Sequence, residues 1–243
     1  MLLSYHKAAC ASSSRSGFDP QNAFDESIKS AWSATSGNSG EWLSVDLGKE
    51  YKVEAVQVNF ADCFTKKKRA PMREYGGTFT QERYIEEELV RYEYRIEYSS
   101  NGTDWAPYEE TQNTVFPHKL IPRRARARYI RIVFASAPYG QNFSISGLRV
   151  FGLGGGEKPS AVSGENAERT SATEARLSWN SQNDAMGYCI RLGIAPDKLY
   201  NSILLYGQND YTVTFLNKET EKYYFAVDSF NESGITKGSI NEF

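Results

Sequence analysis

The sequence has 243 residues, of which 14% are aromatic, and its 28 basic and 30 acidic residues give a formal net charge of −2. This length suits one large domain or two small ones, and the many aromatic residues favour β-sheets over helices. The balanced charge predicts no nucleic-acid partner, and no apolar run approaches the roughly 18 residues that a membrane span needs. Residues 1–156 carry a net charge of +2 and the remainder −4, which favours two domains.

Alternation of apolar and polar residues is the dominant pattern along the chain. Segment 19–30, which precedes the alternating segments, is expected to hold a short turn or 3₁₀ helix. Such alternation indicates antiparallel strands with one buried face, and it occurs at residues 53–60, 92–98, 127–134 and 223–229. Segment 82–89 has the best helical composition, although its spacing is ambiguous. Asn101-Gly102 predicts a hairpin turn.

A glycine run that ends in Pro159 marks a flexible linker at residues 152–159. The sequence therefore predicts a first domain at 1–153 and a second at 158–243.

The three cysteines are Cys10, Cys63 and Cys189. An odd number leaves at least one free thiol unless two chains pair, and we expect all three to be reduced or buried as small apolar residues. A Cys10–Cys63 bridge stays open, because sequence spacing neither supports nor excludes it.

Seven motifs in the first domain are each weak alone, but they occur in a distinctive order. They are ASSS (11–14), NAFD (22–25), SAWSA (30–34), EWLSVDLG (41–48), YSSNGTDW (98–105), ARYIRI (127–132) and LRVFG (148–152). The set resembles the coagulation factor V/VIII type C, or discoidin, family. The resemblance implies an all-β chain that begins with a discoidin-like jelly-roll β-sandwich. We expect Trp42 and Trp105 in its core, and Gly48 at a turn between two strands.

Three further motifs are similar to modules that follow the catalytic domain in family 43 glycoside hydrolases of gut-type Bacteroidetes, enzymes of the β-xylosidase and α-arabinofuranosidase kind. They are VNFAD (58–62), PH (117–118) and SISGLRVFG (144–152). The likeness implies a fibronectin type III β-sandwich after the linker, and ARLSW (175–179), GYCIRL (187–192) and YYFAVDSFNESG (223–234) resemble one. There we expect Trp179 in the core, Tyr223 hydrogen-bonded to backbone, and Asp228 pointing outward.

The discoidin resemblance also implies a metal site. Bacterial domains of this kind are similar to family 32 carbohydrate-binding modules, many of which hold a structural calcium ion that needs six to eight oxygen ligands. Asp25 and Ser30 match the side-chain ligands, whereas Gly147 replaces the acidic residue usual in the last strand, so one ligand is missing. The alternative is that Asp25 is a turn-forming carboxylate that accepts local N–H groups.

Sugar binding in the resembled modules takes place in loops at one end of the sandwich. Loops as long as 62–88 are usually functional or disordered, and stacking rings with planar polar groups suit sugars. The candidates in this loop and in loop 137–143 are Arg69, Arg73, Tyr75, Phe79, Tyr139, Gln141 and Asn142. Two alternatives stay open. The basic run 66–69 and acidic run 86–88 pair with each other in solvent, or the loop docks on another domain.

No motif marks a catalytic site. A glycosidase needs two carboxylates that flank the scissile bond, and nothing indicates such a pair. With only His6 and His118, a catalytic triad or histidine-rich zinc site is not expected. We therefore expect a non-catalytic accessory fragment of a secreted bacterial glycoside hydrolase that acts on plant hemicellulose.

The expected partners are a plant-type polysaccharide or oligosaccharide and the catalytic domain of the parent chain. The family resemblance implies a secreted, periplasmic or cell-surface location, although Met1-Leu2-Leu3 is too short for a signal peptide. One alternative is a structural spacer that packs against the catalytic propeller without binding sugar. Another is a glycan or lipid adhesion module, which we rank last because the loops are more charged than apolar.

Overall fold

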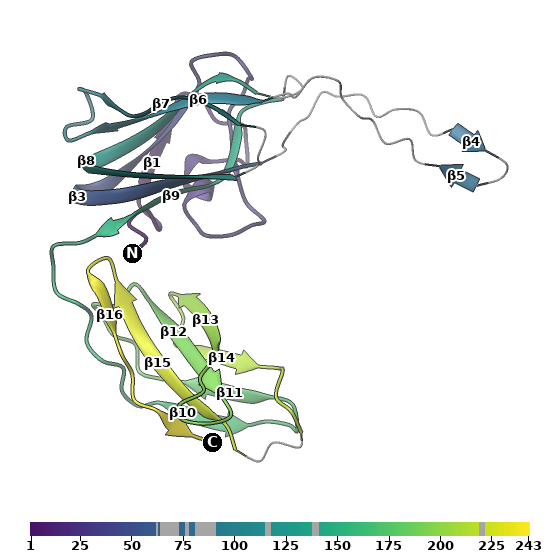
Figure 1. Ribbon diagram of the computed structural model, residues 1–243, viewed down its shortest axis with the longest axis vertical. Coiled ribbons are helices and arrows are strands. Elements are labelled where there is room, and N and C mark those ends of the chain that lie inside the picture. The colour runs from purple at the N-terminus through teal and green to yellow at the C-terminus, as the bar shows by residue number, and fades with distance from the viewer. Residues whose placement is uncertain are drawn as a thin grey trace. The chain divides into compact units, whose positions relative to one another are not determined.

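The computed structural model describes residues 1–61, 63, 73–75, 78–80, 91–114, 118–137, 141–218 and 222–243. Within these, only the backbone is described at 73–75, 78–80, 111–114 and 118. The described chain is all-β apart from one short 3₁₀ helix, η1 (Pro20–Ala23), inside the segment predicted to hold one. It divides into a unit of residues 2–152, here the N-terminal unit, and a unit of residues 153–243 with Met1, here the C-terminal unit (Figure 1).

The main sheet of the N-terminal unit has the strand order β2-β9-β3-β8-β6-β7, with β1 paired to β3. These strands are β1 (Ala8–Ala11), β2 (Trp32–Ser33), β3 (Trp42–Phe60), β6 (Tyr92–Ser99), β7 (Ala106–Thr114), β8 (His118–Ser136) and β9 (Ser144–Leu153). A separate two-stranded hairpin joins β4 (Arg73–Tyr75) and β5 (Thr78–Thr80). The hairpin expected at Asn101-Gly102 is confirmed, because β6 and β7 pair and Gly102 has a φ of +81°.

Strands β3 and β8 are longer than predicted because each continues through a bend. Their pairing register shifts between Asp46 and Tyr51 and again between Val53 and Ala55. Gly48 lies in the first shift at a φ of +90°, a conformation that favours glycine. It therefore permits a bend within one strand, where the sequence predicted a turn between two. The first half of β3 pairs with β1, and its second half lies beside β9.

The core of the N-terminal unit is formed by alternate residues of these strands. Leu43, Val45 and Ile132 are fully buried, as period-two alternation requires. The core tryptophan is Trp32, whose ring Nε1 donates to the Ser13 carbonyl oxygen at 3.0 Å. This hydrogen bond lets the large indole be buried without an unsatisfied donor.

The prediction that Trp42 and Trp105 are core residues is wrong. Both are only partly buried, because they belong to the outer face of the sheet. The Arg131 guanidinium carbon lies 3.9 Å from the Trp105 ring centroid, and Arg131 also donates to Glu97 in β6 at 2.8 Å. The Trp105 indole is therefore covered by a cation–π contact with Arg131 and does not pack in the hydrophobic core.

The C-terminal unit contains two antiparallel sheets around a second core. One sheet has the order β10-β11-β14, and the other β13-β12-β15-β16 with β17 paired to β15. Their bounds are β10 (Asn166–Arg169), β11 (Ala175–Ser178), β12 (Gly187–Gly193), β13 (Asn201–Tyr206), β14 (Asp210–Val213), β15 (Tyr224–Asn231), β16 (Gly234–Thr236) and β17 (Asn241–Glu242). Trp179 is buried in the core as predicted. Tyr223 accepts a hydrogen bond from the Asn217 backbone N–H at 2.7 Å, which confirms its predicted bond to the backbone.

Strand β15 is buried on both faces, which alternation alone did not predict. Phe225 and Val227 lie in the core as expected, but the outward Asp228 is only 1% exposed. The reason is the segment after β16, where Lys237 Nζ and the Gly238 N–H donate to the Asp228 carboxylate at 2.7 and 3.0 Å. Arg191 of β12 adds two further bonds to it at 2.8 and 2.9 Å.

The three cysteines are free thiols, and Cys10 is exposed whereas Cys63 and Cys189 are partly buried. The bridge between Cys10 and Cys63 that the sequence left open is therefore not formed. Burial raises the pKa of the Cys189 thiol, and the Asp228 carboxylate across the strand pair raises it further.

Candidate functional site

The described residues that flank segments 62–90 and 138–140 lie together at one end of the N-terminal unit. Phe60, at the end of β3, stacks on Tyr92 at the start of β6, with ring centroids 3.9 Å apart and planes inclined by 5°. Gln141 Nε2 donates to the Tyr92 hydroxyl oxygen at 2.7 Å. The bases of the two loops proposed to bind sugar are thus tied to each other.

A third segment, 34–36, joins the same end through residues 142–143. Asn142 Nδ2 donates to the Ala34 carbonyl oxygen at 2.9 Å. The backbone bonds Ala34 N–H to Phe143 O and Phe143 N–H to Ser36 O complete the connection, at 2.8 and 3.2 Å. Three loops therefore start from one set of hydrogen-bonded residues, and loops positioned by such a scaffold often carry binding residues.

A carboxylate surrounded by hydroxyls lies next to this base. Glu41 accepts hydrogen bonds from the hydroxyls of Ser13 at 2.8 Å and Ser36 at 2.7 Å, and from Ser12. Burial alone raises the pKa of Glu41, but these hydrogen bonds outweigh it and hold the pKa below its ordinary value. The ionised carboxylate thus cross-links the segments that carry Ser12, Ser13 and Ser36.

The predicted ligand residues are distributed unevenly over the described structure. Arg69 and Tyr139 lie outside the described residues, as do the side chains of Arg73, Tyr75 and Phe79, whose backbone forms the hairpin of β4 and β5. Gln141 and Asn142 are buried, at 1% and 5% exposure. Their amide nitrogens donate hydrogen bonds to the Tyr92 hydroxyl and the Ala34 carbonyl oxygen, so both residues stabilise the bases of the loops.

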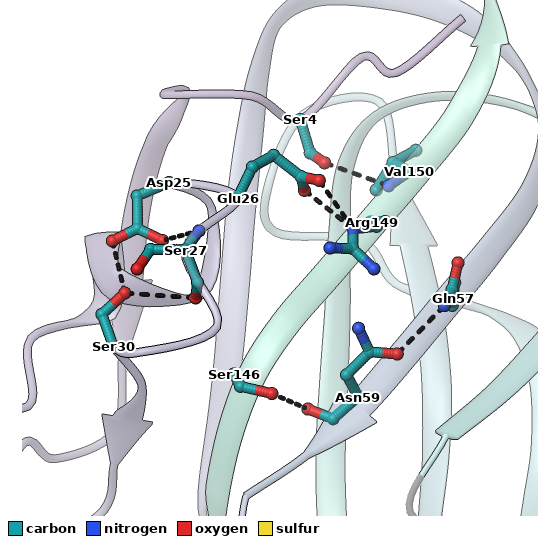
Figure 2. Close-up of polar contacts among 10 residues, drawn as sticks. All are labelled: Ser4, Asp25, Glu26, Ser27, Ser30, Gln57, Asn59, Ser146, Arg149 and Val150. Atoms are coloured by element: carbon teal, nitrogen blue, oxygen red, sulfur yellow. Dashed lines mark hydrogen bonds and ion pairs between the residues drawn. The ribbon is translucent and has the colours of Figure 1, made fainter. Parts of the chain in front are cut away.

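The predicted calcium ligands Asp25 and Ser30 are in direct contact (Figure 2). Ser30 Oγ donates to Asp25 Oδ2 at 2.6 Å, and the Ser27 N–H donates to Asp25 Oδ1 at 2.9 Å. The second bond makes Asp25 a turn-forming residue, the alternative role considered from the sequence. The carboxylate and hydroxyl therefore close the loop of residues 24–30 by themselves.

A guanidinium holds this loop to the last strand of the unit. Arg149 Nε in β9 lies 2.8 and 2.9 Å from the two carboxylate oxygens of Glu26, and the two side chains are 23% and 22% exposed. The Asn59 amide oxygen accepts a hydrogen bond from Arg149 Nη1 at 2.8 Å. The sequence contained no signal for this pair, because 123 positions separate its members.

The donors around this loop do not fit a calcium ion. Gly147 supplies no side-chain oxygen, and a Cβ built there would lie 3.1 Å from the Asn59 amide. Both Asp25 oxygens already accept hydrogen bonds, and the Phe24 and Ala31 carbonyls accept from the His6 N–H and Asn22 Nδ2. Within the described parts of the chain, no three His, Cys, Asp or Glu residues gather closely enough to hold a metal. Calcium takes six to eight oxygens, and here the two side chains that match the expected ligands, Asp25 and Ser30, are bonded to each other.

Comparison with known proteins found one family model, the F5/8 type C domain, which matches residues 7–75. Among solved structures, chitosan-binding module 1 of a chitosanase/glucanase from Paenibacillus sp. IK-5 is 22% identical, with a TM-score of 0.48, over 63% of this chain and 99% of that one. A fucose-binding module from Streptococcus pneumoniae is 18% identical, with a TM-score of 0.43, over 62% and 94%. A Ruminococcus gnavus fucosidase is 20% identical, with a TM-score of 0.46, over 64% and 27%. No curated protein matches the chain.

No helix in the described part of the chain is both long and apolar enough to cross a membrane.

Proposed function

We propose that the N-terminal unit is a carbohydrate-binding module and that the chain is a non-catalytic accessory part of a secreted bacterial glycoside hydrolase. The observation that carries this proposal is the F5/8 type C match over residues 7–75, which runs from the start of β1 to the end of β4. The shared base of the three loops supports it, because Gln141 and Tyr92 hold two of these loops at one end. The saccharide would bind on the loops beyond that base.

A family 43 parent active on plant hemicellulose follows from VNFAD (58–62) and SISGLRVFG (144–152). The fibronectin type III identity of the C-terminal unit follows from its own motifs and is supported by the buried Trp179 and the Tyr223–Asn217 hydrogen bond. We propose that this unit is a spacer or docking unit, which accords with its exposed apolar side chains Ile194, Leu204 and Tyr200.

Binding is tested by affinity electrophoresis and calorimetry of the purified chain against xylan, arabinoxylan and galactosides. We expect retardation by at least one polysaccharide, and loss of it in Arg73→Ala and Tyr75→Ala, because stacking and planar polar contacts hold a sugar. Tyr200→Ala is the matched control, since Tyr200 is an aromatic residue that is 81% exposed in the other unit. It should migrate like the wild type.

Two results would count against the proposal. If no polysaccharide retards the wild-type chain, sugar binding is excluded for these ligand classes and the structural role becomes the better explanation. If Tyr75→Ala binds as tightly as the wild type while Tyr200→Ala does not, the binding site belongs to the C-terminal unit.

A further inference from the structure

We infer that the loop of residues 24–30, here the clamped loop, is ordered by the Arg149 guanidinium and not by a divalent cation. The loop and strand β9 are already joined without a cation, because Arg149 in β9 is paired with Glu26 in the loop (Figure 2). The inference concerns the stability of this loop and does not depend on whether the unit binds sugar.

The backbone of Glu26 is the first argument for this role. Glu26 has a φ of +59°, in the left-handed region that costs energy for a residue with a side chain. Such a conformation persists where surrounding contacts over-determine it. Here the ion pair with Arg149 holds the Glu26 backbone in this conformation, because Arg149 Nε–H donates to both oxygens of the Glu26 carboxylate.

The environment of Arg149 is the second argument. Gly147, two residues earlier in β9, leaves room for the Asn59 side chain, because a Cβ at this position would lie 3.1 Å from the Asn59 amide. Asn59 itself presents its amide toward Arg149 Nη1. Gly147 thus brings no side-chain oxygen to this position, and the Asn59 amide oxygen is already used by the Arg149 guanidinium.

The interior of the loop is the third argument. Ser30 Oγ and the Ser27 N–H bond the two oxygens of Asp25. Each Asp25 oxygen therefore already has a hydrogen-bond donor from within the loop, and the carboxylate is held without a metal ion. The same loop is therefore closed internally by Asp25 and fixed to β9 by Glu26.

The test uses the full chain in 5 mM EDTA or about 5 mM CaCl₂, with tryptic cleavage after Lys29 and thermal unfolding as readouts. Lys29 is exposed and lies within the clamped loop, so its cleavage, followed by mass spectrometry, reports loop opening. For the wild type we expect the same slow cleavage and the same Tm in both buffers. A resident calcium at about a hundredfold excess over its Kd would instead raise Tm by several degrees.

Single substitutions distinguish a specific effect of the Arg149–Glu26 ion pair on the clamped loop from a general loss of stability. Arg149→Met and Glu26→Gln should each speed cleavage after Lys29 by about tenfold or more and lower Tm by about 3–6 °C. Arg128→Met is the matched control, because Arg128 forms a similar two-bond pair with Asp46, at 2.8 and 2.8 Å, away from the loop. It should leave cleavage at Lys29 unchanged.

Glu26→Gly provides a further check, because glycine relieves the positive φ while the ion pair is lost. We expect it to be more stable than Glu26→Gln but cleaved as fast. The inference is overturned if calcium slows cleavage of the wild type several-fold, or if Arg149→Met is cleaved as slowly as the wild type in EDTA.

Discussion

Asp228 shows how a single residue can differ from its strand pattern for a clear physical reason. Its position in β15 points it away from the core, yet it is buried and receives hydrogen bonds from Arg191, Lys237 and the Gly238 N–H. Burial alone raises the pKa of Asp228, but these donors outweigh it and lower the pKa below its ordinary value of 3.8. The carboxylate must therefore stay ionised in the folded unit.

Asp228→Asn should destabilise the C-terminal unit by about 2–3 kcal/mol at pH 7, because the four hydrogen bonds from Arg191, Lys237 and the Gly238 N–H all lose their charged acceptor. Because the folded pKa is depressed, the stabilisation is fully present above pH 3.8 and is lost as pH falls through the lower folded value. The difference between variant and wild type should therefore shrink as the pH falls through the lowered folded pKa of Asp228. Denaturant unfolding at several pH values measures it.

Asp210→Asn is the control for this effect. Asp210 accepts from Arg176 at 2.8 Å, but the two side chains are 48% and 61% exposed. A solvent-exposed pair contributes at most about 1 kcal/mol, so this variant should unfold close to the wild type. If both variants lost the same free energy of unfolding, the burial of Asp228 would add nothing to the stability of the unit.

At the scale of strands, alternation predicted where the chain pairs but not where it bends. The patterns at 53–60 and 127–134 lie inside β3 and β8, yet each of these strands runs for 19 residues. The continuation depends on Gly48 and on register shifts, which are tertiary features.

Trp42 and Trp105 were wrongly predicted to be core residues for a related reason. A large aromatic residue predicts burial, but Arg131 covers Trp105 on the outer face.

The candidate site was less predictable than the strands. Asp25 and Ser30 do meet, as the motif implied, and Gln141 and Asn142 do lie at the loop end, but as buried supports. Arg149 belongs to the LRVFG motif (148–152), which indicates a strand and no role for this side chain. Its partner Glu26 is distant in sequence and nothing local marks the pair, so only the folded arrangement reveals it.

Gly152 shows a close approach between two strands that only glycine allows. A Cβ at this position in β9 would lie 2.2 Å from the Lys52 carbonyl oxygen of β3 and 2.9 Å from Leu3 Cδ1. Gly152→Ala should therefore destabilise the N-terminal unit by about 2–3 kcal/mol, since backbone would have to move. Gly155→Ala, with nothing within 4 Å, should be close to neutral. Thermal unfolding distinguishes them, and equal Tm values would contradict the steric argument.

For the whole molecule, the relevant fact is that each unit closes its own hydrophobic core. Trp32, Phe134 and Phe143 belong to one core, and Trp179 and Phe225 to the other. A cooperative unfolding transition is a property of a core and the sheets around it. Two units with separate cores are therefore expected to give two transitions.

We expect scanning calorimetry of the full chain to resolve two components that respond to different variants. Asp228→Asn should lower only the component of the C-terminal unit, and Arg149→Met only that of the N-terminal unit, because changes without shared partners act independently. Fragments 2–152 and 153–243 expressed separately identify which component is which. If either variant lowers both components equally, the units unfold together, and the C-terminal unit is then part of the stability of the binding module and more than a spacer.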